Sequence, residues 1–527
     1  MTHAGFLQPT RRHLLAGALA GIACAARPGR LHAAVGAEIL RRIPQGLLRG
    51  RRMDGVDRFL GIPFAAPPVG PLRFRPPQPT VSWQGVRTAD GFAPAPMQAP
   101  AQPTPYDPHP PALAEDCLYL NVWAPEAPGP HPVYVWVHGG GNVAGASSMP
   151  VFDGSAFARA GVVCVTLTYR VGSFGFLELG ELLGADYAGS GNNGLRDLIA
   201  GLAWVRDAIA DFGGDPDRVT LGGQSAGAKN VVALMTIPKA QRLFRRAIVE
   251  SGGGHTTSTL HAAHDLARRI AASAGLSDPA ALLSLPAADL VAAQMRMSPL
   301  YPRKYPFRAV LDGNLLAAVP TDAIAAGRAR AIPMLIGTTR DENAFFGPAK
   351  TPDGHVEQRE IANMALADFD AVLARYPAAF PSLDRAAQRY HALTAEEYGI
   401  PTLRLARAHA AAGGATWLYR FDLAPESGPH RDLAVHGSEL ALVWDRLADP
   451  VSAMLGPTGP DAARVAIRMH AAWVDFIKGH APDAWPQFHP ARPATMIFDR
   501  TPHVDHDVDP VGRSLWKDWR PRPFAGV

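Results

Sequence analysis

Short apolar runs alternate along the chain with longer stretches in which apolar residues recur at helical spacing. The β-prone runs lie at residues 118–123, 133–138, 162–168, 246–249, 333–338 and 416–421. Continuous apolar runs of this length are typical of strands that are covered on both faces. The alternation therefore predicts an α/β fold, with a mixed sheet that is mostly parallel in its centre and has helices on both faces.

Three stretches carry the helical pattern. In residues 193–212 most apolar positions, Leu195, Leu198 and Leu202 among them, fall on one helix face. Residues 256–306 and 354–413 are alanine-rich and helical. We expect these two to be helical insertions over the upper edge of the sheet, where they would wall a substrate pocket. No linker sets them apart, so the pattern predicts one catalytic domain over residues 34–527.

The first 33 residues have the architecture of an export signal. Arg11 and Arg12 precede an apolar stretch at residues 14–26, and residues 31–33 (LHA) fit a cleavage site. This order resembles a twin-arginine signal peptide. The apolar stretch is shorter than the roughly 20 residues that span a bilayer. We expect a periplasmic or secreted protein without integral membrane association; a cytoplasmic protein with an apolar N-terminal helix is the alternative.

The charge balance separates this signal from the rest of the chain. Of the 527 residues, 47% are apolar and 19% are charged, and the formal net charge is +4. Arg11, Arg12, Arg27 and Arg30 account for the whole excess, because residues 1–33 contain no Asp or Glu. The remaining chain is formally neutral, which indicates no nucleic acid or other polyanionic partner. The expected partner is a small molecule. The sequence does not indicate an oligomeric state.

The most informative motif is the pentapeptide at residues 223–227, GQSAG. It fits the G-x-S-x-G pattern of a nucleophile elbow, a sharp turn from strand to helix that exposes a serine hydroxyl. The β-prone residues 219–221 precede it and the helical residues 226–235 follow it, as that geometry requires. The pattern makes Ser225 the candidate nucleophile, and an ordinary glycine-rich turn is the alternative.

A serine nucleophile also needs donors for the oxyanion that its attack creates. Residues 138–141 (HGGG) directly follow the predicted strand at 133–138. Such a loop after an early strand is the expected partner of a serine elbow. We expect the backbone N–H groups of Gly140, Gly141 and Ala226 to form the oxyanion hole.

Two late loops supply a base and an acid. His436 follows the predicted strand at 416–421, and Glu342 follows the one at 333–338. The order serine, acid, histidine matches that of α/β-hydrolases. All three side chains would stand at the carboxyl edge of the sheet, where open α/β folds place their sites. On the residues alone, Asp341 competes with its neighbour Glu342 for the role of the acid.

Five further sequence blocks lie at residues 59–64 (FLGIPF), 67–74 (PPVGPLRF), 115–122 (EDCLYLNV), 169–177 (YRVGSFGFL) and 212–216 (FGGDP). Together with the motifs above, they resemble the type-B carboxylesterases, a family related to the cholinesterases. The resemblance covers nearly all of the chain after the signal and implies the α/β-hydrolase fold. It also implies that Glu342, rather than Asp341, is the triad acid and that His436 is the base. Ser251 resembles a position that helps to hold the acid, and a structural polar role at the end of the strand at 246–249 is the alternative.

The same resemblance implies structural pairings and one missing disulfide. It implies two ion pairs, Arg73 with Glu115 and Arg170 with Asp197. It also aligns Cys117 with a cysteine that is usually bonded to one upstream, but residues 92–98 contain no cysteine. That disulfide is therefore absent. We expect Cys117 and Cys164 to be buried thiols, and a disulfide between them stays open.

The substrate pocket is where the chain departs from its apparent relatives. Asn142 follows the glycine triplet at a position where an aromatic residue is common, and Gln224 stands where Glu is frequent. We expect Asn142, Phe345 and Phe346 to contact the substrate.

These features predict a carboxylic-ester hydrolase that forms an acyl-enzyme on Ser225 and needs no metal or organic cofactor. An amidase or lactone hydrolase with the same triad is the alternative among enzymes. A catalytically inert, cholinesterase-like binding or adhesion protein is the alternative outside them. Such relatives typically lose a triad member, whereas this chain keeps all three.

Overall fold

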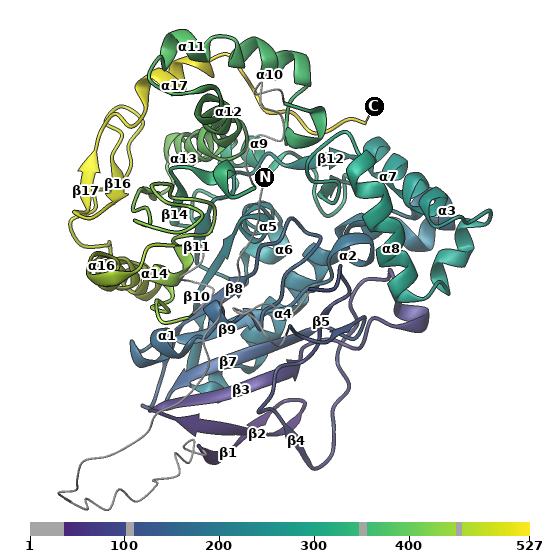
Figure 1. The fold of residues 1–527 in the computed structure, drawn as a ribbon. Coiled ribbons are helices and arrows are strands. Elements are labelled where there is room, and N and C mark those ends of the chain that lie inside the picture. The colour runs from purple at the N-terminus through teal and green to yellow at the C-terminus, as the bar shows by residue number, and fades with distance from the viewer. Residues whose placement is uncertain (1–35, 102–109, 347–355, 450–455, 527) are drawn as a thin grey trace, which may run out of the picture. The chain divides into compact units, whose positions relative to one another are not determined.

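The computed structural model describes residues 36–101, 110–346, 356–449 and 456–526. The expected signal at residues 1–33 lies outside the described residues. From Gly36 onward the chain forms one compact unit, shown in Figure 1.

A single large sheet organises this unit. Thirteen strands of the described residues belong to it. In spatial order, with β4 (Val86–Thr88) beside β2, they are β1 (Ala37–Ile43), β2 (Gly46–Met53), β3 (Val56–Pro63), β7 (Tyr119–Pro125), β9 (Val163–Leu167), β8 (His131–Val137), β10 (Gly214–Gln224), β11 (Arg246–Glu250), β14 (Met334–Thr339), β15 (Thr416–Phe421), β16 (Thr495–Phe498) and β17 (His503–Asp505).

The centre of the sheet is parallel and its edges are antiparallel, as the alternation predicted. Strands β9, β8, β10, β11, β14, β15 and β16 run parallel, whereas β1 to β3, β7 and β17 pair antiparallel. Gly223 of β10 is level with Val137 of β8 and Val249 of β11. The carboxyl ends of these strands therefore meet at one edge of the sheet.

Alternate side chains of each central strand enter separate cores on the two faces. In β8, Val133, Val135 and Val137 join the core built on α4 (Asn193–Ala208) and α5 (Ala226–Leu234). Tyr134 and Trp136 join the other core, which includes α16 (Gly459–Lys478) and α14 (Leu440–Val443). A strand that is buried on both faces reads as a continuous apolar run, which is why the pattern revealed it.

The two expected insertions are helical. The first contains α7 (Leu260–Ser273) and α8 (Ala287–Met297), which pack against each other and against α2 (Gly172–Phe176) and α3 (Gly180–Leu183). The second contains α10 (Leu366–Leu373), α11 (Tyr376–Ala379), α12 (Arg385–Thr394) and α13 (Ile400–Ala411). Helix α13 packs on β14 and β15, and in Figure 1 the green helices α12 and α13 lie next to β14.

Both expected ion pairs form in the structure. The guanidinium of Arg73 donates through Nε to Glu115 at 2.7 Å, and the guanidinium of Arg170 donates two hydrogen bonds to Asp197 at 2.8 and 2.7 Å. Cys117 and Cys164 are free, buried thiols, so the disulfide that the sequence left open between them does not form. Burial raises the pKa of both thiols, which keeps them protonated and unreactive.

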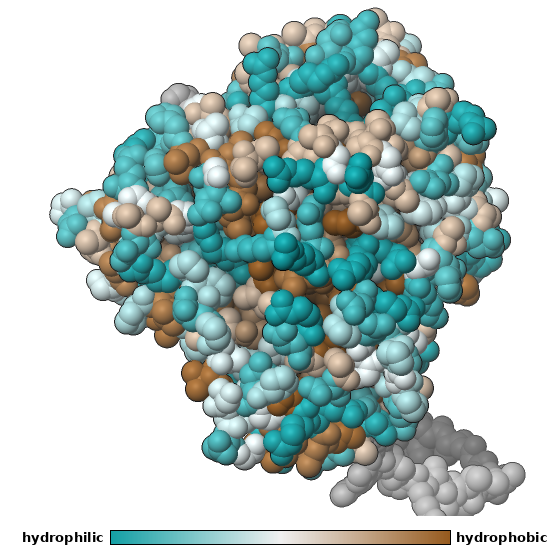
Figure 2. Space-filling view, turned by 180° about the vertical axis from the view of Figure 1, so that it is seen from behind, coloured by the Kyte–Doolittle hydropathy of each residue, from teal (hydrophilic) through white to brown (hydrophobic). Residues whose placement is uncertain are grey.

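The surface is mixed in character. Figure 2, seen from behind, shows hydrophobic residues interspersed with hydrophilic ones. The most exposed large apolar side chains, Val81, Leu300 and Ile467, come from separate segments. None of the helices within the described ranges is long and apolar enough to cross a membrane.

Candidate active site

Ser225 occupies a strained turn between β10 and α5. Its φ of 57° and ψ of −123° lie in a region that residues with a side chain rarely adopt. Its N–H donates to the carbonyl of Glu250 on β11 at 2.8 Å. A Cβ at position 227 would lie 2.1 Å from the Val137 carbonyl oxygen, and one at position 223 would lie 2.7 Å from the Gly227 backbone. Only glycine fits at both places, which explains the spacing of the pentapeptide.

The glycine loop after β8 packs directly against this turn. A Cβ on Gly139 would lie 3.0 Å from the Ser225 Cβ. Gly140 and Gly141 have φ values of 107° and 64°, which glycine adopts without strain. Within the described part of the chain, the N–H groups of Gly140, Gly141 and Ala226 donate no hydrogen bond. Three unpaired donors therefore lie beside Ser225.

Glu342 and His436 meet at the same edge of the sheet. Glu342 is fully buried, and its Oε1 accepts a hydrogen bond from the Thr339 N–H at 2.9 Å. Its Oε2 accepts a hydrogen bond from Nδ1 of His436. With the proton on Nδ1, the lone pair of the imidazole is on Nε2, the nitrogen that a general base needs.

Asp341 is engaged elsewhere. Its Oδ2 accepts hydrogen bonds from the Arg340 Nε at 2.8 Å and from the Ala434 N–H at 2.9 Å. It thus fastens the loop that leads to His436 without contacting the imidazole. Of the two adjacent carboxylates, Glu342 is the one in contact with His436.

The other ring nitrogen of His436, Nε2, accepts a hydrogen bond from a side-chain amide. Gln224 donates a hydrogen bond through its side-chain Nε2 to the His436 Nε2 at 3.1 Å. Among the described hydrogen bonds this is the one that Nε2 makes, and none joins Nε2 to the Ser225 hydroxyl. For Ser225 to lose its proton to His436, the amide of Gln224 must move off Nε2.

Aromatic side chains surround the His436 ring. The ring centroid lies 4.8 Å from that of Tyr398, 6.2 Å from that of Phe345 and 5.8 Å from that of Phe346. The two phenylalanines are 38% and 42% exposed, whereas Tyr398 is buried. Phe345 and Phe346 therefore form an exposed apolar wall next to His436, where the sequence placed substrate contacts.

A narrow cavity opens beside the glycine loop and Ala226. Asn142 lies in its wall, buried and fixed: its Oδ1 accepts from Asn230 at 2.9 Å and its Nδ2 donates to the Phe307 carbonyl at 3.3 Å. Lys229 and Arg308 also line the cavity, and the sequence analysis missed both. Lys229 had a usable signal, because a residue four positions after Ser225 lies on the same helix face.

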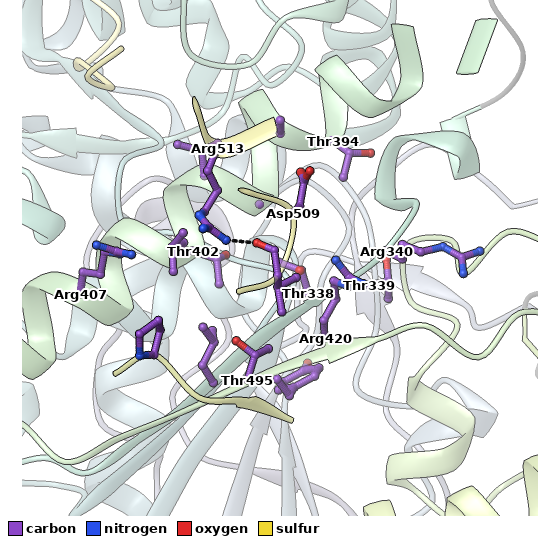
Figure 3. A pocket seen from close by; sticks show the side chains of 18 of the residues that line it. Thr338, Thr339, Arg340, Thr394, Thr402, Arg407, Arg420, Thr495, Asp509 and Arg513 are labelled. Atoms are coloured by element: carbon purple, nitrogen blue, oxygen red, sulfur yellow. Dashed lines mark hydrogen bonds between the residues drawn. The ribbon is translucent and has the colours of Figure 1, made fainter. Parts of the chain in front are cut away.

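A larger cavity is lined in part by Thr338 and Thr339, at the end of β14. Figure 3 shows Thr338, Arg407, Arg420 and Arg513 around it. Arg420 is held by two hydrogen bonds of 2.6 Å to Asp422. The lining includes no residue of the glycine loop or of the serine turn, and not His436, so this cavity is separate from them.

Two buried carboxyls lie behind the serine turn. Glu250 accepts a hydrogen bond from the indole Nε1 of Trp473 at 2.7 Å. Burial raises the pKa of Glu250 to about 8. Burial, and then the neighbouring Glu250, raises the pKa of Glu439. At neutral pH the protonated form of Glu250 is therefore favoured.

The raised pKa of Glu250 predicts a pH-dependent stability. Between pH 4.5, its ordinary pKa, and about 8, the folded protein holds a proton that the unfolded chain has lost. Stability therefore falls as pH rises through this window, by at most ~1.4 kcal/mol per pH unit for one proton. We expect Glu250→Gln, which needs no proton, to melt with a shallower loss between pH 5 and 8. Melting temperatures measured across this range check it, with the exposed Glu38→Gln as the control. Equal slopes for Glu250→Gln and the wild type would contradict the assignment.

The comparisons with known proteins agree with this architecture. The carboxylesterase family model matches residues 37–512. A para-nitrobenzyl esterase of Bacillus subtilis is 35% identical over 490 residues, covering 88% of this chain and 95% of the relative. A fumonisin B1 esterase of Sphingopyxis macrogoltabida is 37% identical over 477 residues, covering 86% and 85%. Among solved structures, a carboxylesterase of Geobacillus stearothermophilus is 36% identical with a TM-score of 0.79, covering 90% of this chain and 99% of its own.

The fold and these relatives define an α/β-hydrolase that cleaves carboxylic esters through a serine acyl-enzyme. The chain belongs to the carboxylesterase family, in its type-B branch. The expected fold class, family and enzyme class are thus confirmed, and the inert binding protein is set aside.

Proposed function

We propose that Ser225, His436 and Glu342 form the catalytic triad of this esterase. The observation that supports this most is the contact between Nδ1 of the His436 imidazole and Glu342, at the sheet edge that also holds the serine turn. His436 Nε2 takes the Ser225 proton while Oγ attacks the ester carbonyl. The imidazolium that forms is stabilised by the carboxylate of Glu342.

The tetrahedral oxyanion is held by the N–H groups of Gly140, Gly141 and Ala226. Removing one oxyanion donor in other enzymes costs about 3–4 kcal/mol. When the intermediate collapses, the bond to the alcohol oxygen breaks and His436 protonates that oxygen. Water, deprotonated by His436, then attacks the acyl-Ser225 ester. The acid leaves and Ser225 regains its proton.

The substrate is a small carboxylic ester, and the matched test is an ester against its amide. We expect turnover of 4-nitrophenyl butyrate and a far lower kcat/KM for butyryl 4-nitroanilide, because the aniline is a poorer leaving group than the phenolate. Release of the chromophore measures both rates. A kcat/KM for the anilide equal to or above that for the ester would favour the amidase alternative. Faster opening of γ-lactones than of open-chain esters would favour the lactone hydrolase.

We also propose that residues 1–33 direct export by the twin-arginine route. The paired arginines, the apolar stretch at residues 14–26 and the absence of Asp and Glu from residues 1–33 support this. In a bacterial host with that pathway, we expect esterase activity in the periplasmic fraction. Replacing both Arg11 and Arg12 by lysine should leave the activity in the cytoplasm; unchanged export would contradict the proposal.

A further inference from the structure

The cavity beside the oxyanion donors contains an excess of positive charge. Lys229 and Arg308 line it, and Lys304 lies close behind it, against the same carboxylate as Lys229. Buried cations are costly unless they are paired, so the counter-charge of each cation decides whether the cavity favours an anion.

Within the described ranges Lys229 pairs with one carboxylate, that of Glu397, which it shares with Lys304. Its Nζ lies 3.5 Å from Oε1 of Glu397, whose Oε2 accepts from the Lys304 Nζ at 2.8 Å. The Lys229 ammonium also lies 4.6 Å from the centre of the Tyr305 ring. The two lysines hold the pKa of Glu397 below its usual range, so one ionised carboxylate serves two ammonium groups.

Arg308 has no carboxylate partner within 4.0 Å among the residues that the structure describes. It is 2% exposed, and its Nε and Nη2 donate to the backbone carbonyls of Tyr305 and Ala362, both at 2.6 Å. Burial lowers the pKa of Arg308 to about 10, so it stays charged at neutral pH. The hydroxyl of Thr257, also in the cavity wall, is buried without a hydrogen-bond partner. The cavity thus offers two cations and a hydroxyl to an anion.

The positions of the oxyanion donors and of His436 determine which half of an ester enters this cavity. Both halves extend from the carbonyl carbon, which must lie among Gly140, Gly141 and Ala226. The leaving oxygen must lie next to His436, because His436 protonates it. The cavity is lined by Gly141 and Ala226 but not by His436. The acyl half therefore occupies the cavity, and the alcohol half lies toward His436, Phe345 and Phe346.

We propose that the preferred substrates are monoesters of dicarboxylic acids, whose distal carboxylate binds between Lys229 and Arg308. This inference rests on the proposed function, since it needs the oxyanion donors and His436 in their assigned places. An acyl chain with a terminal carboxylate supplies the counter-charge that Arg308 lacks. A neutral acyl chain fills the same space and leaves Arg308 without a carboxylate partner.

The test compares two six-carbon 4-nitrophenyl esters that differ in one terminal group: the hexanoate and the adipate monoester. After subtraction of the uncatalysed rates, we expect the wild type to show the higher kcat/KM for the adipate monoester. In Lys229→Gln, kcat/KM for the adipate monoester should fall by about 10- to 100-fold, the effect of losing one charged hydrogen bond. The loss on the hexanoate should be smaller, so that the preference for the adipate monoester falls. Lys229→Arg should retain the preference, and the exposed Lys239→Gln should behave as the wild type.

Each outcome decides the inference. A wild type that hydrolyses the hexanoate without preferring the adipate monoester overturns it and leaves the triad standing. Equal losses on both esters in Lys229→Gln overturn it by giving Lys229 a general structural role. Hydrolysis of neither ester overturns the proposed function and the inference together. Inhibition of the wild type by free adipate is a further test. Adipate should compete with the ester more strongly than hexanoate does. Inhibition that is not competitive would overturn the inference, because the cations would then bind a regulatory anion outside the acyl position.

Discussion

Replacing Ser225 by alanine is expected to lower kcat for 4-nitrophenyl ester hydrolysis by about 10⁴- to 10⁶-fold, as the loss of a triad serine does in other hydrolases. Alanine removes the only atom that forms the acyl ester. The oxyanion donors and the acyl cavity remain, so KM should change little and residual activity should stay above the uncatalysed rate. The strained φ of 57° at this position is tolerated by alanine no better than by serine.

The control for this substitution is another serine at the start of a helix. Ser155 begins α1 (Ser155–Arg159), whose Phe157 packs in the core on the opposite face of the sheet from α5. Ser155→Ala should retain kcat within a few-fold. Melting curves of both variants show whether either loses its fold. Turnover of Ser225→Ala near the wild-type level would contradict the assigned nucleophile.

The second large effect is expected at the triad acid. Glu342→Gln should lower kcat by about 10⁴-fold, the loss seen when a triad carboxylate becomes an amide in a serine protease. Gln keeps the shape and can accept from the Thr339 N–H, but it carries no charge to stabilise the imidazolium. Its amide can also donate to Nδ1, which would shift the proton to Nε2 and remove the base. kcat measured at saturating substrate checks the prediction.

Asp341→Asn is the matched variant for the neighbouring carboxylate. Asp341 binds Arg340 and the Ala434 N–H, so we expect a lower melting temperature and a smaller loss of kcat. Asn still accepts both hydrogen bonds, although the bond to Arg340 loses its charge. A larger loss of kcat for Asp341→Asn than for Glu342→Gln would reverse the assignment.

The strands that the sequence revealed are those buried on both faces. The expected run at 133–138 is β8 within two residues, and the run at 416–421 coincides with β15. The strands β1 to β3 were missed because the first of them alternates exposed and half-buried positions and is rich in arginine. Arg41 and Arg52 pair there with the buried Asp57, so ion pairs replace part of the apolar signal.

The helix expected over residues 193–212 is shorter in the structure than the spacing of its apolar residues predicted. It ends at Ala208, and residues Ile209–Phe212 form a 3-10 turn that packs apolar side chains in the same way. Ile209 and Phe212 stay in the core, so hydrophobic spacing alone does not register the change of helix type. The following Gly213, with a φ of 77°, stops the turn.

Candidate site residues that belong to local motifs could be read from the sequence, whereas those joined only by tertiary contacts could not. Ser225 and the glycine loop are local motifs, and chain order pointed to Glu342 and His436. The pairing of Lys229 with Glu397 joins residues 168 positions apart, and no spacing rule links them. The hydrogen bond from Gln224 to His436 likewise spans 212 positions. Its consequence, an amide that must leave Nε2 before catalysis, needed the folded geometry.

The most direct test of the account is to locate the acyl group. The enzyme is mixed rapidly with a 4-nitrophenyl ester, quenched in acid and digested, and the peptides are weighed and sequenced by mass spectrometry. The account predicts one acyl group per chain, attached to Ser225 in the peptide that contains residues 223–227, and no label in Ser225→Ala. An acyl group on another residue, with Ser225 unmodified while turnover proceeds, would contradict it.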